Sequence, residues 1–342
     1  MEETVHLVTN RNLLSEKEAK VRFGDTYNGL GPHQLRYGEA RVRVPPEAKR
    51  RFGGGHARVA ASVFPEHLPH AEEGPKARAL LGSSGWLEML RQKALRNRAD
   101  LLVLMHGFAS DFDTALERAA QRKMLYATPA RPLEVIVFSW PSDGRAFGLK
   151  LREGLKLQYF DGRTDAAGSA MAIARAFYRR TGFVRGLDEG QACGRSVHRL
   201  AHSMGNDALR HALQQMIRDA PRGRLPRLFE NIFLMAADED DDALNDEAKL
   251  ARLPEIAAAA HVYMARNDQA LVISDSTKGN PDRLGAAGPR TLSDLPRKVT
   301  LIDCEAVSDT EGLDAHLRHQ YHRTPPRGGG RCAGGAGRAA AR

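Results

Sequence analysis

Short apolar runs alternate with amphipathic stretches along most of the chain. Continuous apolar runs predict buried strands at residues 5–9, 101–105, 135–138, 197–201, 231–237, 261–264 and 299–302. Apolar residues at helical spacing predict helices at residues 86–98, 115–125, 166–180 and 206–218. Strands that alternate with helices in this way predict an α/β fold, with a mainly parallel central sheet covered by helices on both faces.

The first hundred residues follow this pattern less regularly. Residues 5–9 and the alternating segment 40–44 predict two opening strands at a sheet edge. Residues 53–85 are rich in Gly, His and Pro and predict a loop-rich insertion, and residues 143–165 also look irregular.

We therefore expect one α/β domain over residues 1–326. Its first part, 1–99, holds the N-terminal strands and the insertion, and 100–326 forms the core that carries the chemistry. The Gly/Ala/Arg-rich tail, 327–342, predicts disorder because it offers little to bury.

The formal net charge of +9 is concentrated at the C-terminus, where the last twenty residues hold five arginines and no acid. The mild excess over the remaining chain does not indicate a nucleic-acid-binding surface. No segment reaches the ~18 apolar residues of a membrane span, and the N-terminus lacks the features of a secretory signal, so we expect a cytoplasmic protein. Cys193, Cys304 and Cys332 are too scattered for a disulfide framework or a zinc site and predict free thiols.

The segment Ala201-His202-Ser203-Met204-Gly205 leads from an apolar run into a predicted helix. A serine on such a sharp turn is held in a strained backbone conformation, with its hydroxyl exposed above the sheet. The residues two before and two after it must be small because strand and helix crowd there. We predict Ser203 as a nucleophile and the Met204 amide as a donor to a developing oxyanion. The alternative is a serine that merely caps the helix.

A second loop supports this interpretation. The apolar run 101–105 ends in His106-Gly107-Phe108. Gly107 lets the backbone turn, and the Phe108 amide is the natural second oxyanion donor. We expect His106 and Gly107 to support the site, together with His202 and Gly205.

A nucleophilic serine in this kind of fold is followed along the chain by an acid and then a histidine. Asp268 comes just after the run 261–264 and is the preferred acid. Asp238 is its rival and opens the acidic run 238–242. Clustered carboxylates can bind a hard cation, but this run lacks the glycine and spacing of a calcium loop. It predicts a solvated acidic loop, and we expect neither a metal nor an organic cofactor.

The base must follow Asp268, where the sequence offers His316, His319 and His322. Their spacing of three would suit a metal cluster on a helix. Periodicity alone does not choose among them.

Taken together, these motifs resemble a bacterial family of α/β-hydrolases of unknown function, loosely described as an esterase/lipase superfamily. The resemblance spans residues 5–326 and rests on Thr9-Asn10-Arg11, Tyr37-Gly38, Val42–Pro45, His106-Gly107-Phe108, Phe138-Ser139-Trp140-Pro141-Ser142, Tyr159, Asp161, Ala201-His202-Ser203-Met204-Gly205-Asn206, Asn267-Asp268, Ala270-Leu271, Ser274 and Arg283-Leu284-Gly285.

In that family the base often lies in a Gly-His-Ser-Tyr-like segment. The nearest match here is Arg318-His319-Gln320-Tyr321, with Arg in place of Gly and Gln in place of Ser. The resemblance therefore implies His319 as the base, with His316 as the runner-up.

The leading hypothesis is a serine hydrolase that acts on a small-molecule carboxylic ester through Ser203, Asp268 and His319 and an acyl-enzyme intermediate. A non-catalytic binding or scaffold protein on the same fold is the alternative. Metal-dependent hydrolysis through the acidic run and the C-terminal histidines is a third hypothesis. The sequence specifies neither the substrate nor the oligomeric state.

Overall fold

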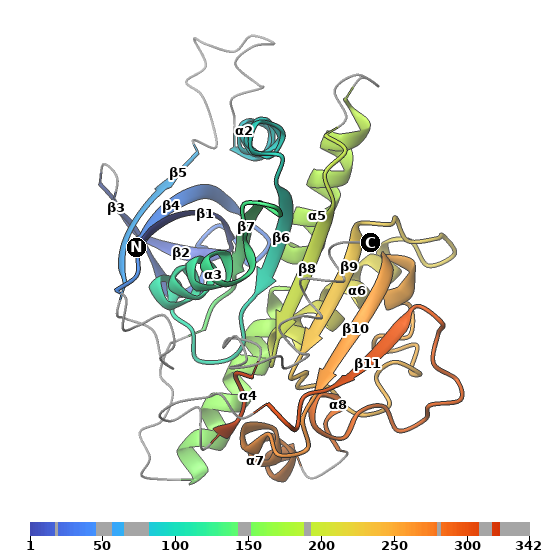
Figure 1. Cartoon of the computed structure of the whole chain (residues 1–342). Coiled ribbons are helices and arrows are strands. Elements are labelled where there is room, and N and C mark those ends of the chain that lie inside the picture. The colour runs from blue at the N-terminus through green and yellow to red at the C-terminus, as the bar shows by residue number, and fades with distance from the viewer. Residues whose placement is uncertain are drawn as a thin grey trace.

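The computed structural model of the chain is built around one large sheet. It describes residues 1–17, 20–45, 57–64, 82–142, 152–187, 193–278, 282–307 and 317–321. Nine strands form the sheet in the order β11-β10-β9-β8-β6-β7-β1-β4-β5. Helices lie on both faces of this sheet (Figure 1), which confirms the predicted α/β architecture.

Seven neighbouring strands of the sheet run parallel. They are β1 (Glu2–Thr9), β6 (Asp100–Met105), β7 (Leu133–Ser139), β8 (Val197–His202), β9 (Phe229–Met235), β10 (Ala257–Met264) and β11 (Val299–Asp303). Parallel strands end at a common edge, so the loops that follow them gather there. In Figure 1 these ends point toward the bottom of the molecule.

The N-terminal strands extend the sheet in the antiparallel sense. Strand β4 (Arg36–Arg43) pairs with β1, and β5 (Arg58–Val63) pairs with β4. The two opening strands, β1 and β4, lie next to one edge of the sheet rather than at it, because β5, from the segment predicted to be loops, pairs outside β4. Residues 53–56 and 65–81 of that segment lie outside the described residues. A hairpin of β2 (Arg11–Lys17) and β3 (Lys20–Tyr27), which the pattern did not predict, follows β1.

The helices cover the two sheet faces unequally. Helix α3 (Phe112–Tyr126) packs on one face, and α2 (Gly82–Asn97), α5 (Ala170–Arg185) and α6 (Gly205–Asp219) pack on the other. Alternate residues of each strand point to opposite faces. Leu102 and Leu104 of β6 therefore join the core beneath α3, whereas Met105 joins the core beneath α6.

Three further helices lie near the carboxyl ends of the strands: α4 (Arg152–Gly168), α7 (Gln269–Lys278) and α8 (Leu284–Ala287) (Figure 1). A short 3-10 turn, η4 (Leu253–Glu255), precedes β10. Residues 143–165 looked irregular in sequence, yet a helix begins at Arg152. The predicted helix over 166–180 is divided, since α4 ends at Gly168 and α5 begins at Ala170.

The cysteines correct one further expectation. Cys304 is disulfide-bonded, so the prediction of three free thiols is wrong. Cys193 is a free thiol. Sequence spacing says little about which sulfur atoms meet in the fold. Within the described ranges, no helix combines the length and the apolar character needed to span a bilayer.

Candidate active site

Ser203 lies in the turn between β8 and α6. Because β8 pairs with β6 on one side and β9 on the other, this turn is central among the strand ends. The Ser203 backbone has φ +54°, in the left-handed region that a residue with a side chain seldom adopts. Its N–H donates to the Met235 carbonyl at 3.0 Å, and its carbonyl accepts from the Asn206 N–H at 3.0 Å. This is the strained conformation expected of a nucleophile on a strand-to-helix turn.

Two glycines let the loop after β6 approach this turn. A Cβ on Gly205 would lie 2.7 Å from the His106 carbonyl oxygen and 2.8 Å from that of Met105. A Cβ on Gly107 would lie 2.9 Å from the Ser203 Cβ. These contacts are too short for any side chain, so glycine at both positions is a requirement of close packing.

The two predicted oxyanion donors belong to these adjoining loops. In the described part of the chain, neither the Phe108 N–H nor the Met204 N–H donates a hydrogen bond. Met204 lies at the N-cap position of α6, so its N–H falls outside the intrahelical ladder. Both amides are therefore available to an oxygen of a ligand.

The predicted acid and base meet in the structure. His319 Nδ1 lies 2.7 Å from Asp268 Oδ2, and the Asp268 side chain is fully buried. Asp268 Oδ1 also accepts the Leu271 N–H at 3.1 Å, which fixes the carboxylate at the start of α7. His202 Nε2 donates to the His319 carbonyl at 3.1 Å. Since His202 directly precedes Ser203, this bond ties the predicted base to the turn that holds Ser203.

A second anchor holds the segment 317–321 in place. The Tyr321 hydroxyl donates to the Tyr263 carbonyl at 2.9 Å and accepts from the Ala236 N–H at 3.0 Å. Burial raises the pKa of Tyr321 well above its usual value, so the hydroxyl keeps its proton. Arg318 has φ +50°, a conformation that favours glycine. His316 and His322, the other candidate bases, lie outside the described residues.

Asp238, the rival acid, holds two helices together. Its Oδ2 accepts from the Tyr159 hydroxyl of α4 at 2.5 Å, and its Oδ1 accepts from the Ser274 hydroxyl of α7 at 2.7 Å. Burial, with the nearby Asp238 charge, raises the pKa of Tyr159 far above its usual value. The carboxylate bonded to the His319 ring is that of Asp268.

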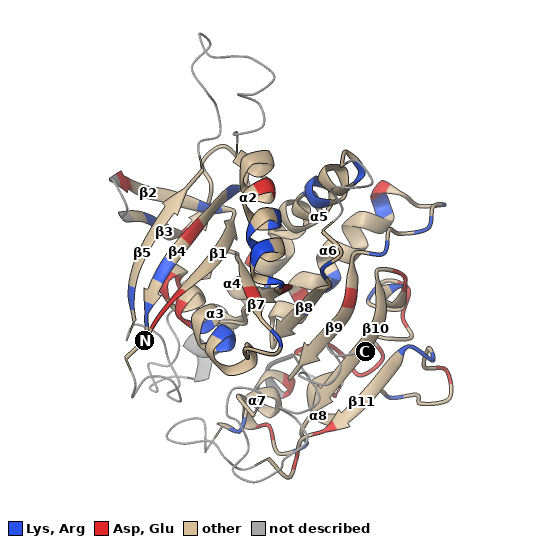
Figure 2. Ribbon diagram, turned by 45° about the horizontal axis from the view of Figure 1, so that its top comes forward, with Lys and Arg blue, Asp and Glu red and all other residues tan. Residues whose placement is uncertain are grey.

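The acidic run that begins at Asp238 is not a solvated loop, so that prediction is wrong. Glu239 and Asp241 are buried, and they pair with Arg210 at 3.0 Å and Arg290 at 2.7 Å. Lys and Arg segments are interspersed with Asp and Glu segments over the molecule (Figure 2), which makes such pairing possible. No group of three His, Cys, Asp or Glu residues suited to a metal occurs in the part of the chain that the structure describes.

Arg11 is a functional candidate that the sequence analysis assigned no role. Its guanidinium is completely buried and donates to the Ser139 hydroxyl at 2.8 Å, the Ser142 carbonyl at 3.0 Å and the Ser110 carbonyl at 2.6 Å. It therefore ties the loop after β7 to the loop that carries Phe108. In the sequence, its position just after a predicted strand, in the Thr9-Asn10-Arg11 motif, could have indicated this role.

His106 supports the same loop. Its ring stacks on Trp140, with ring centroids 4.9 Å apart and planes 9° apart, and its carbonyl accepts from Trp140 Nε1 at 3.1 Å. Burial, with a smaller effect of the Arg11 charge, lowers the pKa of His106 well below its usual value. His106 is therefore neutral, and its Nδ1 lies 2.9 Å from the Gly107 carbonyl oxygen.

Helix α4 packs against the side chains of Phe108 and Met204. A Cβ on Gly162 would lie 2.8 Å from the Phe108 ring and 3.2 Å from the Met204 sulfur. The Tyr159 ring meets the Phe108 ring edge to face, with centroids 6.2 Å apart. A glycine on α4 thus allows the helix to rest directly on the residues that carry the two donors.

A family model for alpha/beta hydrolases of unknown function (DUF900) matches residues 86–327, which is more than two thirds of the chain. Neither the curated proteins nor the solved structures gave a match. The matched residues include Ser203 in the turn between β8 and α6, the loop after β6, and the hydrogen-bonded pair of Asp268 and His319. The chain therefore belongs to this family of α/β-hydrolases.

Proposed function

We propose that the protein is a serine hydrolase that cleaves small-molecule carboxylic esters. Ser203 is the nucleophile, His319 the general base and Asp268 the acid that orients it. The observation that carries this proposal is the 2.7 Å bond between two buried side chains, His319 and Asp268. The His319 carbonyl is bonded to the residue next to Ser203.

In the first half of the reaction, His319 Nε2 takes the proton of the Ser203 hydroxyl as its oxygen attacks the ester carbonyl. Asp268 accepts the Nδ1–H, which fixes the tautomer and stabilises the imidazolium. The Phe108 and Met204 N–H groups stabilise the oxyanion of the tetrahedral intermediate. His319 then returns its proton to the departing alcohol, which leaves the acyl group on Ser203.

The second half repeats these roles with water. His319 takes a proton from a water molecule, the resulting oxygen attacks the acyl-enzyme, and Ser203 leaves with the proton. Because Asp268 is buried, its charge acts through a poorly screening medium and has a stronger effect on His319 than it would in water.

The proposal is tested by labelling the full chain with a fluorophosphonate probe. We expect wild type to be labelled and Ser203→Ala to lose labelling and several orders of magnitude in turnover on an ester panel of increasing chain length. Ser293→Ala, which removes an exposed serine, is the matched control and should label like wild type. Equal labelling of wild type and Ser203→Ala would contradict the assignment, and no turnover of any ester would favour a binding protein on this fold.

A further inference from the structure

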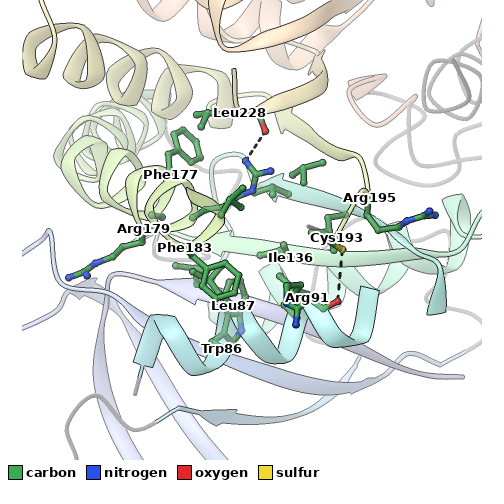
Figure 3. A pocket seen from close by; sticks show the side chains of 18 of the residues that line it. Trp86, Leu87, Arg91, Ile136, Phe177, Arg179, Phe183, Cys193, Arg195 and Leu228 are labelled. Atoms are coloured by element: carbon green, nitrogen blue, oxygen red, sulfur yellow. Dashed lines mark hydrogen bonds between the residues drawn. The ribbon is translucent and has the colours of Figure 1, made fainter. Parts of the chain in front are cut away.

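A partly open cavity of about 240 Å³ lies away from the proposed catalytic residues. It is bounded by α2, α5 and the sheet face between them (Figure 3). Leu101 and Val197, at the beginnings of β6 and β8, line it, whereas Ser203 follows the end of β8. None of the proposed triad is among the described residues that line the cavity.

The cavity wall is apolar and carries positive charge. Aromatic and aliphatic side chains such as Trp86, Phe177 and Phe183 form most of it. Five arginines line it and no described lining residue is acidic. The arginines do not all face inward, because Arg179 and Arg195 are exposed and point away from the cavity (Figure 3).

Two of the remaining arginines already have oxygen partners. Arg91 donates to the Glu88 carboxylate through two nitrogens, at 2.7 Å each. Arg180 donates to the Leu228 carbonyl at 2.8 Å, a bond drawn in Figure 3. Arg91 therefore has an anionic partner, and Arg180 has one neutral acceptor.

Arg199 differs from the others. It lies on the central strand β8 and its side chain is completely buried. Among the residues that the structure describes, none is a hydrogen-bond partner of its three guanidinium nitrogens. The guanidinium carbon lies 4.8 Å from the centroid of the Phe177 ring and 5.7 Å from that of Phe229. An aromatic ring attracts the face of the guanidinium. The five N–H donors lie in the plane of the guanidinium, so this contact does not satisfy them.

Such a group is costly in the free protein. A buried charge without an opposite charge or hydrogen-bond acceptors loses its hydration without compensation. Burial accordingly lowers the pKa of Arg199 to about 9, so the group is still a cation at neutral pH. An anion inside the cavity would supply both the missing charge and the missing acceptors.

We propose that this cavity is a binding site for a carboxylate with an apolar tail, whose head group pairs with Arg199. A cavity of ~150 Å³ admits benzene, so this larger one accommodates a tail of roughly eight to ten carbons. The planar guanidinium matches a carboxylate in two parallel hydrogen bonds. The apolar wall of α2 and α5 takes up the tail. The site is independent of the proposed esterase chemistry.

The test is calorimetric titration of the full chain, as wild type and as Ser203→Ala, with octanoate, 1-octanol and acetate. We expect octanoate to bind both proteins equally, and at least tenfold more tightly than either octanol, which lacks the charge, or acetate, which lacks the tail. No binding at millimolar octanoate, or equal affinity for octanoate and octanol, would overturn the proposal.

Variants locate the site. Arg199→Met should weaken octanoate binding at least tenfold and leave octanol binding within about twofold, while Arg179→Met, which removes an outward-pointing arginine, should change neither. Ala176→Phe keeps Arg199 but fills the cavity, so it should abolish both, and it serves as the independent test if Arg199→Met does not fold. Unchanged octanoate affinity in a folded Arg199→Met or Ala176→Phe protein would refute the site.

Discussion

At the scale of single residues, the proposed chemistry depends on backbone conformations that few side chains adopt. Ser203 and Arg318 both have positive φ, at +54° and +50°. Each stays there because neighbouring bonds hold it: Ser203 through Met235 and Asn206, and Arg318 because the next residue, His319, is fixed by Asp268 and His202. The left-handed conformation costs roughly 1–2 kcal/mol for a residue with a Cβ.

Arg318 gives a prediction about backbone strain. Arg318→Gly relieves the left-handed strain but adds freedom to the unfolded chain, so we expect unfolding free energy within ~1 kcal/mol of wild type and near-normal turnover. Arg318→Val should lose ~1–3 kcal/mol and much of the turnover, because a β-branched residue resists this conformation and would displace His319. Urea unfolding and ester turnover check both. A valine variant as active and stable as the glycine variant would contradict the argument.

The proposed base gives a second prediction. His319→Ala should lower turnover about as much as Ser203→Ala, with the double variant little worse, because residues that act as a unit are not additive. Asp268→Asn should cost roughly 10⁴-fold, since an amide no longer fixes the productive tautomer of the ring. Steady-state turnover of one well-cleaved ester, measured for these four variants, checks the prediction.

The rival candidates serve as controls for that series. Asp238→Asn should be milder than Asp268→Asn, because Asp238 binds the Tyr159 and Ser274 hydroxyls of two helices. His316→Ala and His322→Ala should keep most activity, since Asp268 already bonds to His319. If Asp238→Asn were the more damaging carboxylate substitution, the assignment of the acid would be reversed.

At the scale of elements, the site is a set of loops after parallel strands, held together by contacts between distant segments. Arg11, which follows β1, bonds the loops after β6 and β7. Tyr321 bonds to Ala236, which directly follows β9, and to Tyr263 near the end of β10. Helix α4 then rests on Phe108 and Met204 through Gly162.

The packing of α4 predicts that a substitution at Gly162 lowers turnover without lowering the stability of the fold. Gly162→Ala gains helix propensity, about 1 kcal/mol, but its methyl group would lie 2.8 Å from the Phe108 ring and push that residue away. We expect little change in unfolding free energy and a clear fall in turnover. Gly182→Ala on α5 is the matched control, because a Cβ there meets nothing within 4 Å. It should gain ~0.5–1 kcal/mol with turnover unchanged. Normal turnover in Gly162→Ala would show that Phe108 does not need this position.

At the scale of the whole molecule, one buried carboxylate joins the N-terminal strand and two helices to the central sheet. Glu134 of β7 is almost completely buried and contacts His6 of β1 at 3.3 Å, Lys123 of α3 at 3.0 Å and Asn97 of α2 at 2.9 Å. Burial alone raises the pKa of Glu134, but the hydrogen bond with His6 and the charge of Lys123 outweigh it and lower the pKa to about 2.

This shift predicts how stability depends on pH. The carboxylate stabilises the fold fully above its ordinary pKa of 4.5, and this contribution is lost as pH falls toward 2. Glu134→Gln should therefore be ~2–3 kcal/mol less stable near neutral pH, with the difference from wild type narrowing below pH 4.5. Denaturant unfolding from neutral to acid pH measures it. Glu230→Gln, which breaks the more exposed pair with Arg227, should change stability by less than ~1 kcal/mol. A constant gap for Glu134→Gln across pH would rule out this linkage.

Much of this architecture followed from the sequence because its signals are local. Continuous apolar runs predicted the parallel strands, and the small residues around Ser203 predicted a sharp turn after one of them. The prediction of a solvated loop at residues 238–242 was wrong because the ion-pair partners of these acids are not local. Arg210 and Arg290, for example, lie far away in the chain. The pattern of charges along a segment shows which side chains are acidic. Whether those side chains are exposed to water depends on the residues that the fold packs against them.

By itself the sequence determined the α/β class and predicted the sharp turn at Ser203, because periodicity and turn chemistry act over a few residues. Its choice of Asp268 and His319 stays a prediction, and His319 was preferred only through the family resemblance. Only the tertiary structure decided that Asp268 contacts His319, that Arg11 joins two loops, and that Arg199 faces an apolar cavity with no hydrogen-bond partner in the described ranges of the chain. These facts depend on contacts between residues tens to hundreds of positions apart. Such contacts exist only once the sheet is assembled and its strand ends share one edge.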